Sequence, residues 1–374
     1  MSGPDPRREV EQELLAWMAE DRFTPDRERF ERLALALFRI QFERCEPYRR
    51  FCLGRGRTPE NVAASEEIPA VPTGAFKEVP LRGFAPEATV RTFRTSGTTR
   101  GRPGELHLDT TALYDASLCP SFRRFLLPDL LPGERIPIRV LAPSEDEAPH
   151  SSLSYMFARA IETFGECGSG FDLRGGALDL GGLEAAVEEA QRVSRPILLC
   201  GTAFAFVHLV DALAARGRGL PLPPGSRLME TGGYKGRSRT LAPEALRREL
   251  AASLDVPEER IVNQYGMTEL ASQFHDSVLR FPGSPRRKLG PPWARVLARD
   301  PNSGKLLPPG EVGVLEIIDL ANTGSVLAVE TADLGRVYPG EPFGGFEVLG
   351  RESGAEERGC SLAAELMLGG RVQR

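Results

Sequence analysis

The chain of 374 residues is 41% hydrophobic and 26% charged, with a formal net charge of −5 at pH 7. These proportions are typical of a globular protein, and the acidic balance argues against a constitutive nucleic-acid binder. The 39 glycines and 31 prolines indicate many loops, but they fall short of the fraction found in disordered low-complexity sequence. A chain of this length can bury a sufficient core without a disulfide or a metal to stabilise it.

The N-terminal sequence and the cysteine content predict the cellular location of the protein. No apolar segment follows the first charged residues, so the sequence predicts no secretory signal. No run approaches the roughly 18 apolar residues of a membrane-spanning helix. Six cysteines are few for a disulfide scaffold, and their spacing matches no zinc or thioredoxin-type motif. We therefore expect a cytoplasmic protein with no membrane span and no nucleic-acid partner.

The N-terminal part is predicted to be helical. Val10, Leu14 and Met18 fall on one face of a 3.6-residue period, which is typical of an amphipathic helix. The Thr-Pro-Asp sequence at 24–26 is a helix-start signal, with a hydroxyl cap, proline at the first helical position and acid in the first turn. Apolar residues over 30–41 continue at helical spacing. We interpret these segments as a helical layer.

The middle of the chain predicts an α/β sheet. The proline-rich run 68–77 is expected to be an extended connector into the main body. Beyond it, short apolar runs alternate with helical patterns, which is typical of a sheet with crossover helices. Strands are expected near 136–141, 196–200, 227–230 and 260–264, and helices near 183–193, 204–215 and 243–254. Past residue 290, short strands and turns are closer to a β-meander or barrel.

The first motif is the loop Phe-Arg-Thr-Ser-Gly-Thr-Thr-Arg-Gly-Arg-Pro-Gly at 93–104. Its backbone N–H groups and hydroxyls can donate to phosphate oxygens, and its glycines let the main chain come close. Its arginines can add charge-assisted bonds. The pattern is neither a Walker A nor a dinucleotide fingerprint, so a plain flexible turn is the alternative.

Two further motifs follow. Asn-Gln-Tyr-Gly-Met-Thr-Glu at 263–269 comes directly after a predicted strand, where ligands of α/β sheets bind. Its Tyr can stack on a purine, its Thr can bond a phosphate and its Glu can hold Mg²⁺. In Thr-Ala-Asp-Leu-Gly-Arg at 331–336 and Gly-Arg at 350–351, the Asp can accept ribose hydroxyls and an Arg can meet a phosphate. The alternatives are a strand leading into a capped helix, a turn Asp and a surface Arg.

In this order the motifs resemble the superfamily of acyl-adenylate-forming enzymes, which includes acyl-CoA synthetases, peptide-synthetase adenylation domains and beetle luciferases. The Glu-Thr-Gly-Gly sequence at 230–233 lies where that superfamily has a glycine-rich loop that contacts adenine. Within it, the chain most resembles the LuxE-type acyl-protein synthetases, over essentially its whole length. The stretches that carry this likeness are 30–38, 68–77, 201–204, 230–236 and 358–361.

The resemblance implies a role for each residue of the first motif. The residues expected to cradle the β- and γ-phosphates of ATP are Thr95, Ser96, Gly97, Thr98, Thr99 and Gly101. The loop departs from the family pattern in two places. The usual Thr-Thr-Gly step is Thr99-Arg100-Gly101 here, so the loop is altered or lengthened by one residue, and Arg102 is the nearest cation where relatives have a lysine. Arginine and lysine differ at a point-charge site, so this change bears on ATP affinity.

The resemblance also implies the other contacts. They are Gly232 and Gly233 along the adenine, Tyr265 on the base, Thr268 as a catalytic residue at the α-phosphate, Glu269 on Mg²⁺, Asp333 on the ribose and Arg351 beside it. The implied cofactors are therefore ATP and Mg²⁺. The implied substrate is a carboxylic acid, and a fatty acid is the expected kind.

The implied reaction runs in two steps. A carboxylate attacks the α-phosphorus of ATP and pyrophosphate leaves, a reaction that enzymes promote mainly by positioning and charge neutralisation. The acyl-adenylate then meets a thiol. LuxE-type synthetases use a cysteine near the C-terminus as a thioester carrier before a partner reductase or other carrier, and Cys360 fits that position. Arg358 could favour its thiolate. The alternative is an incidental cysteine.

The remaining cysteines and histidines are given lesser roles. The five other cysteines are predicted to be core residues, because they lie in apolar segments. His208, on an apolar helical pattern, is also predicted to be buried. His150 and His275 could line the acyl pocket, although the turn at 201–204 is the better candidate for its wall.

The expected fold is α/β: the large N-terminal domain of an adenylate-forming enzyme, with mixed sheets, packed helices and a β-rich part. We expect a helical layer over 1–55, the adenylate-forming core over 56–335 and a truncated C-terminal segment over 336–374. Full-length relatives carry a lid domain with a catalytic lysine after the Gly-Arg hinge, whereas no lysine follows Arg351. We therefore expect the lid to be reduced to a short tail.

Two other functions stay open at this point. One is an acid–CoA ligase of the phenylacetate–CoA ligase type, in which coenzyme A accepts the acyl group. The other is a non-catalytic relative that binds an acyl group or a nucleotide, for which the altered loop around Arg100 is the main support. The sequence leaves the identity of the acid and the oligomeric state undetermined.

Overall fold

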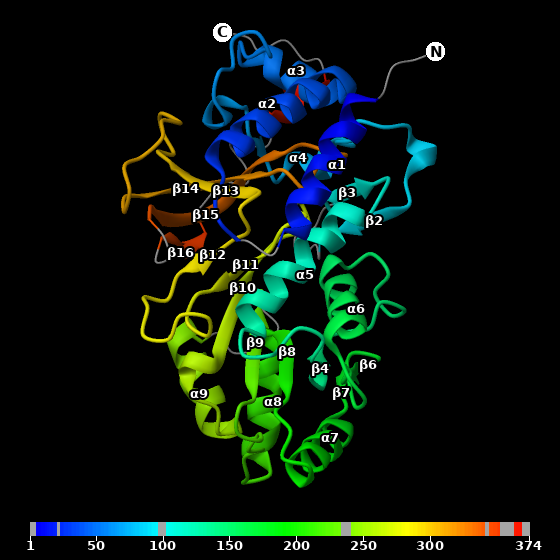
Figure 1. Ribbon diagram of the computed structural model, residues 1–374, viewed down its shortest axis with the longest axis vertical. Helices are drawn as coiled ribbons and strands as arrows, with labels where there is room; N and C mark the ends of the chain where they lie inside the picture. Colours follow the sequence, from blue (N-terminus) through cyan, green and yellow to red (C-terminus); the bar gives the residue numbers. More distant parts are fainter. Residues whose placement is uncertain are drawn as a thin grey trace. The chain divides into compact units, whose positions relative to one another are not determined.

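The computed structural model describes residues 5–20, 23–95, 102–232, 241–340, 344–351 and 363–368. The chain divides into two compact units, and most of their helices and strands are labelled in Figure 1. Unit 1 comprises Met1–Pro120, Met267–Gln273 and Leu289–Arg374, and unit 2 comprises Ser121–Gly266 and Phe274–Lys288. The division at residues 55 and 335 expected from the sequence stays a prediction.

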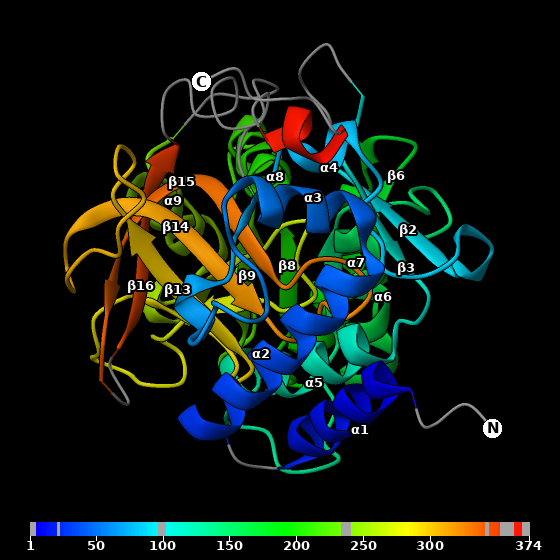
Figure 2. The same cartoon turned by 90° about the horizontal axis from the view of Figure 1, so that it is seen from above.

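Three helices begin unit 1, as the apolar spacing predicted. They are α1 (Pro6–Ala19), α2 (Arg27–Arg44) and α3 (Glu46–Gly54), and α2 packs against both of the others (Figure 2). The predicted start of the second helix at Thr24 is wrong by a few residues. Asp26 is the N-cap, and its carboxylate accepts the backbone N–H of Arg29 at 2.9 Å. A carboxylate caps a helix at least as well as a hydroxyl, so the helix begins after it.

The sheet of unit 1 is an antiparallel meander, which confirms the change of pattern past residue 290. Its strands follow one another in sequence order as β13 (Ala294–Arg299), β14 (Val312–Asp319), β15 (Ala328–Tyr338) and β16 (Gly345–Arg351). The predicted connector 68–77 is extended only in part. It contains β1 (Val71–Pro72), which pairs in parallel with β15, and the short helix α4 (Ala75–Glu78).

Unit 1 also contains a hairpin and short turns. A separate hairpin pairs β2 (Arg91–Arg94) with β3 (Glu105–Leu108). Short 3₁₀ turns are found at η1 (Ser65–Glu67) and η2 (Pro86–Ala88). Helix α5 (Ala112–Leu126) follows the hairpin in the chain, and it begins in unit 1 and ends in unit 2.

Unit 2 is built on a mostly parallel sheet. Its strand order is β5–β4–β8–β9–β10–β11, and only β11 runs antiparallel to its neighbour. These strands are β4 (Ile138–Leu141), β5 (Gly170–Phe171), β8 (Leu198–Thr202), β9 (Arg227–Thr231), β10 (Ile261–Tyr265) and β11 (Phe274–Asp276). The helices are α6 (Ser152–Phe164), α7 (Leu180–Arg192), α8 (Ala203–Ala215) and α9 (Pro243–Leu254). The short elements are β6 (Leu173–Arg174), β7 (Ala177–Leu178), η3 (Glu258–Arg260) and β12 (Lys288–Leu289). The predicted strand–helix alternation is confirmed.

The core of unit 2 joins helices and strands through side chains that are fully removed from water. Leu183 of α7, Phe206 of α8 and Leu250 of α9 belong to one cluster with Leu199 and Leu228 of the sheet, and each has 0% exposure. Truncation of a buried phenylalanine such as Phe206 costs about 3–5 kcal/mol. No helix in the described ranges is both long and apolar enough to cross a membrane.

The cysteines divide by environment. Cys45, Cys52 and Cys200 are buried as predicted. The prediction is wrong for Cys167, which is exposed, and only half right for Cys119, which is half-buried. Cys167 lies in the exposed turn that follows α6.

Candidate active site

The first motif is the connection of the β2–β3 hairpin in unit 1. The backbone N–H of Thr95 donates to the carbonyl of Gly104 at 2.9 Å, and Gly104 N–H donates to Thr95 Oγ1 at 2.8 Å. Phe93 and Leu106, each 0% exposed, are register partners across the hairpin. The base of the loop is therefore fixed. Ser96, Gly97, Thr98, Thr99 and Gly101 lie outside the described residues, so their roles stay predictions.

Thr268 links the second motif to the first. Its Oγ1 donates to the carbonyl of Arg94, the last residue of β2, at 3.5 Å. Arg94 directly precedes Thr95, so two hydroxyl residues far apart in sequence belong to the same corner of unit 1. Glu269 is buried, and its carbonyl accepts a hydrogen bond from Asn322 Nδ2 at 3.1 Å.

Asp319 holds the segment that follows Thr268 and Glu269. This carboxylate is 0% exposed at the end of β14, and it accepts from Ala271 N at 2.9 Å, Ser272 N at 2.8 Å and Ser272 Oγ at 2.7 Å. Burial raises the pKa of Asp319, while the hydrogen bonds from Ser272 act against the rise. Sequence reasoning missed this residue. The available signal was an acid at the end of a run of apolar strand residues.

Asp333 and Arg351, the two candidate residues of the third motif, lie next to each other in the structure. They are register partners in β15 and β16, and Arg351 Nε lies 3.7 Å from Asp333 Oδ1. The side chain of Asp333 is 17% exposed, whereas that of Arg351 is 75% exposed. Asp333 therefore belongs to a strand rather than to a turn. Its arginine partner remains accessible to solvent at the end of β16.

In unit 2, the adenine candidates follow two neighbouring parallel strands. Thr231 of β9 is the register partner of Gln264 of β10, and Thr231 Oγ1 donates to the Gln264 carbonyl at 3.1 Å. Gly232 comes next with φ of +69°, a left-handed conformation that favours glycine. Tyr265 ends β10, and its ring centroid lies 6.3 Å from that of Phe274. The predicted glycine turn after a strand is confirmed, while Gly233 lies outside the described residues.

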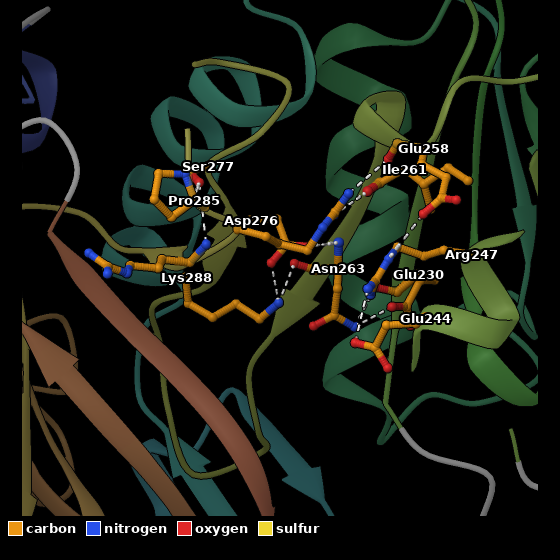
Figure 3. Close-up of polar contacts among 12 residues, drawn as sticks. Glu230, Glu244, Arg247, Glu258, Ile261, Asn263, Asp276, Ser277, Pro285 and Lys288 are labelled. Atoms are coloured by element: carbon orange, nitrogen blue, oxygen red, sulfur yellow. Dashed lines mark hydrogen bonds and ion pairs between the residues drawn. The ribbon is translucent and has the colours of Figure 1, made fainter. Parts of the chain in front are cut away.

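A buried polar network surrounds Asn263 in the same unit, as Figure 3 shows. Asn263 Nδ2 donates to Glu230 Oε1 at 2.6 Å, and Asn263 N–H donates to Asp276 Oδ2 at 3.0 Å. Lys288 Nζ donates to Asp276 Oδ1 at 2.5 Å and to the Asn263 carbonyl at 3.2 Å. Glu230, Asp276 and Lys288 are all buried. Sequence reasoning gave none of the three a role, although Glu230 lies in the predicted adenine-contacting segment. The available signal was a charged residue beside apolar residues in each short strand.

The two carboxylates of the network have opposite shifts. Burial raises the pKa of Glu230 to about 7, against opposing effects from Lys288 and Asn263. Burial also acts to raise the pKa of Asp276, but Lys288 and Arg286 outweigh it and hold that pKa below its usual value. Arg286 Nη1 donates to Asp276 Oδ2 at 2.7 Å. A buried carboxylate between two cations keeps its charge, whereas one held mainly by an amide gives it up more readily.

The family model of the LuxE acyl-protein synthetases matches residues 179–368, just over half of the chain. The chain belongs to the LuxE family. It is 23% identical over 354 residues to the long-chain-fatty-acid–luciferin-component ligase of Aliivibrio fischeri, with 91% of this chain and 89% of that protein covered. The family makes this chain an ATP-dependent ligase that forms acyl-adenylates, as the ordered motifs predicted.

Solved structures confirm the fold of this LuxE-family ligase. An open form of 2-hydroxyisobutyryl-CoA ligase has a TM-score of 0.62 and 15% identity, covering 88% of this chain and 76% of that one. A postadenylation form of the same enzyme has a TM-score of 0.63 and 14% identity, covering 88% and 69%. The fold is therefore that of an adenylate-forming ligase.

The histidines of the LuxE-family chain differ from expectation in one case. His208 is exposed, so its predicted burial is wrong. Phe204, His208 and Asp211 form the outward stripe of α8, with the rings of Phe204 and His208 edge to face at 4.4 Å. His150 is exposed, and His275 is completely buried. The possible role of His150 and His275 in an acyl pocket stays a prediction.

His275 is the most unusual side chain of unit 2. Its ring stacks on Phe125 at 5.7 Å between centroids, and neither ring nitrogen has a hydrogen-bond partner among the described residues. Burial lowers its pKa to about 3. The imidazole is therefore neutral at physiological pH and is held as an apolar ring.

Proposed function

We propose that this LuxE-family ligase activates a carboxylic acid, a fatty acid by analogy with its Aliivibrio fischeri relative, and transfers the acyl group to Cys360. The observation that carries the proposal is the contact of Thr268 with the end of β2. It places the hydroxyl of the Thr-Glu pair at the base of the loop that is rich in phosphate donors. Loops with aligned hydroxyl and backbone donors are suited to bind phosphate groups.

In the first step, a carboxylate oxygen of the acid forms a bond to the α-phosphorus of ATP, and the bond to pyrophosphate breaks. Thr268 would turn its single hydroxyl hydrogen from the Arg94 carbonyl to the α-phosphate, and the hairpin loop after Thr95 would bind the β- and γ-phosphates. The protein's contribution is to align the reactants and to neutralise the developing charge. The hydrogen bonds of Asp319 to Ala271 and Ser272 keep the segment after Thr268 in place.

The same proposal assigns the nucleoside contacts. Tyr265 would pack on the adenine, with Gly232 and Gly233 along its edge, where the left-handed turn at Gly232 exposes the backbone. Asp333 would accept the ribose hydroxyls, and Arg351 lies beside it. Each assignment combines the family resemblance with a position at the end of a strand or within an accessible ion pair.

Glu269 would hold Mg²⁺. No group of three or more histidine, cysteine or acidic side chains in the described ranges could form a complete metal site. Mg²⁺ in nucleotide enzymes needs only one or two carboxylates, because waters and phosphates supply the other ligands. A single buried carboxylate next to Thr268 fits that mode. When bound, Mg²⁺ would neutralise phosphate charge.

In the second step, the sulfur of Cys360 forms a bond to the acyl carbon, the bond to the phosphate oxygen breaks, and AMP leaves. The thiolate is the nucleophile, so the reacting cysteine needs an accessible sulfur and a low thiol pKa. Burial raises the pKa of Cys45 to about 11 and that of Cys52 to about 12, and it raises the pKa of Cys200 still further. These three thiols are unsuited to the reaction, and among the other cysteines the family resemblance assigns it to Cys360. A free thiol in turn favours a cytoplasmic location, and a reductase or carrier would receive the acyl group.

The proposal is tested with radiolabelled fatty acid and ATP, followed by a denaturing gel. We expect a labelled protein band that hydroxylamine releases, and we expect Cys360→Ser to abolish the band while pyrophosphate exchange continues. Cys167→Ser, at an exposed cysteine, is the matched control and should leave the band unchanged. Acyl-CoA formation without a labelled band would instead show a CoA ligase. Absence of exchange with every acid tried would show a binding protein.

A further inference from the structure

Both donor hydrogens of the Asn263 side-chain amide already have acceptors. Asn263 and Glu230 are register partners in β10 and β9. Asn263 Nδ2 donates to Glu230 Oε1 at 2.6 Å and to the Glu230 carbonyl at 3.4 Å. An amide nitrogen carries two hydrogens, so Glu230 receives both. Oδ1 is then the atom of this amide that is left to meet a ligand, and it can only accept.

The main chain of Asn263 is fixed independently. Its N–H donates to Asp276 Oδ2 at 3.0 Å, and its carbonyl accepts from Lys288 Nζ at 3.2 Å. Lys288 and Arg286 neutralise Asp276 at 2.5 and 2.7 Å. Because the backbone of Asn263 is held, its side chain can move only by rotation about its own bonds. The hydrogen bonds to Glu230 prevent that rotation. Figure 3 shows Glu230 and Asp276 on different sides of Asn263.

Asn263 shares a strand face with Tyr265. Side chains alternate along a strand, and residues two apart lie about 7 Å apart on the same face. Asn263 and Tyr265 are both half-buried, whereas Val262 and Gln264 are buried. Under the proposed function Tyr265 packs on the nucleotide base. The Asn263 amide is then within one strand repeat of that base.

We propose that Glu230 is a positioning residue that turns the Asn263 amide oxygen toward the base, and that it thereby selects a purine with an amino group at position 6. The inference rests on the proposed function and deepens it. The 6-amino group of adenine is a donor that Asn263 Oδ1 can accept. A 6-oxo purine presents an oxygen at that position, so two acceptors would face each other and both would lose their hydrogen bonds.

The charge of Glu230 gives this inference a specific pH dependence. The ionisable groups around it are Lys288, Asp276 and Arg247, and the neighbours of those groups are Arg286, Glu244 and Glu258. An ionised Glu230 can only accept, which fixes the amide in one orientation. A protonated Glu230 can also donate, so the amide can turn over and present its NH₂ group. Because the pKa of Glu230 is raised to about 7, adenine selectivity should weaken as the pH falls below that value.

The test measures direct binding of ATP and of ITP, whose base is a 6-oxo purine, by equilibrium dialysis without acid substrate. We expect the wild type to prefer ATP. Glu230→Gln should reduce that preference roughly tenfold, because a glutamine amide can donate as well as accept. The wild-type preference should fall between pH 8 and pH 6, and that of Glu230→Gln should not. The matched control is Glu244→Gln, at a carboxylate on α9 that pairs with Arg247 and makes no contact with Asn263.

Each outcome bears on one proposal or the other. An unchanged, pH-independent ATP preference in folded Glu230→Gln, with folding checked by circular dichroism, overturns the inference. If that variant is unfolded, Asn263→Ala should lose the same preference, and retention of it would also overturn the inference. Glu230-dependent ATP binding without pyrophosphate exchange would refute the proposed reaction and leave this inference standing. Pyrophosphate exchange that uses ATP and ITP equally well would refute this inference and leave the proposed reaction standing.

Discussion

At the scale of single residues, the buried imidazole of His275 should make the fold sensitive to acid. Its pKa is lowered from 6.5 to about 3 in the folded protein. Below pH 6.5 the unfolded chain binds a proton on His275 that the folded chain does not bind, so the free energy of unfolding falls as the pH falls toward 3. The slope contributed by one such group is about 1.4 kcal/mol per pH unit.

We expect His275→Phe to remove this contribution while keeping the ring on Phe125. As the pH is lowered below 6, the unfolding free energy of the variant should rise relative to that of the wild type by about 1 kcal/mol per pH unit. Urea unfolding at a series of pH values measures it. His150→Phe, the same substitution at an exposed histidine, is the control. A parallel pair of pH curves for His275→Phe and wild type would contradict the assignment.

Glu230 contributes the opposite slope, and the two residues should largely offset each other. Its pKa rises from 4.5 to about 7 on folding, so its stability contribution is lost as the pH rises through that range. Between pH 4.5 and 6.5 the folded chain gains one proton on Glu230 and lacks one on His275. Their combined effect on the pH dependence of stability there is small, which is why the single variant is needed to reveal either.

At the scale of secondary-structure elements, Asp319 connects the end of β14 to the segment after Thr268 and Glu269. We expect Asp319→Asn to lose the charge-assisted part of four hydrogen bonds, from Ala271, Ser272 and Ala321, and to destabilise the fold by about 1–3 kcal/mol. Pyrophosphate exchange should fall at least tenfold, because the Thr268 hydroxyl is no longer held. Exchange rates at saturating and limiting ATP measure the effect.

Asp300 provides a matched control for that variant. Its Oδ1 accepts from Asn302 N, Ser303 N and Ser303 Oγ in an exposed turn, which is a similar donor set without burial. Asp300→Asn should therefore leave exchange unchanged. If Asp319→Asn is equally active at equal stability, Asp319 has no role in holding the Thr268 segment.

The elements also show how far the sequence predicts this molecule. Apolar periodicity located α8 and α9 closely, since these helices bury one stripe or more against the sheet. It missed the hairpin formed by β2 and β3, because four-residue strands leave a pattern too short to recognise. It also missed Glu230 and Asp276. Their partners are supplied by neighbouring strands, and a single sequence gives no information about strand order. The motifs themselves were recognised from family resemblance rather than from physical pattern.

At the scale of the whole molecule, two distant parts of the chain meet in unit 1. The helix at 363–368 packs on α3, where Arg50 Nη1 donates to the Met367 carbonyl at 3.3 Å. A Cβ atom on Gly54 would stand 2.5 Å from Leu366 Cδ2, so the absence of a side chain there lets the two helices approach. Ala363 and Met367 are each 1% exposed. The C-terminal helix is therefore anchored by burial.

This anchor restricts where the proposed acyl acceptor can go. Cys360 precedes Ala363 by three residues, and three residues span at most about 11 Å when extended. We expect Met367→Asp to release the helix, because a charge cannot stay in that apolar contact without a partner. Acylation of Cys360 should then fall several-fold, while pyrophosphate exchange, which needs no thiol, should continue at the wild-type rate.

The control is Leu368→Asp, because Leu368 is on the same helix and is 65% exposed. It introduces the same charge one residue away and should leave both half-reactions intact. Single-turnover transfer of label from preformed acyl-adenylate to protein separates the two steps directly. Equal transfer rates in Met367→Asp and Leu368→Asp would mean that Cys360 reaches the adenylate without its anchor. A joint loss of exchange and transfer would mean that the helix supports the fold of unit 1 rather than the position of the thiol.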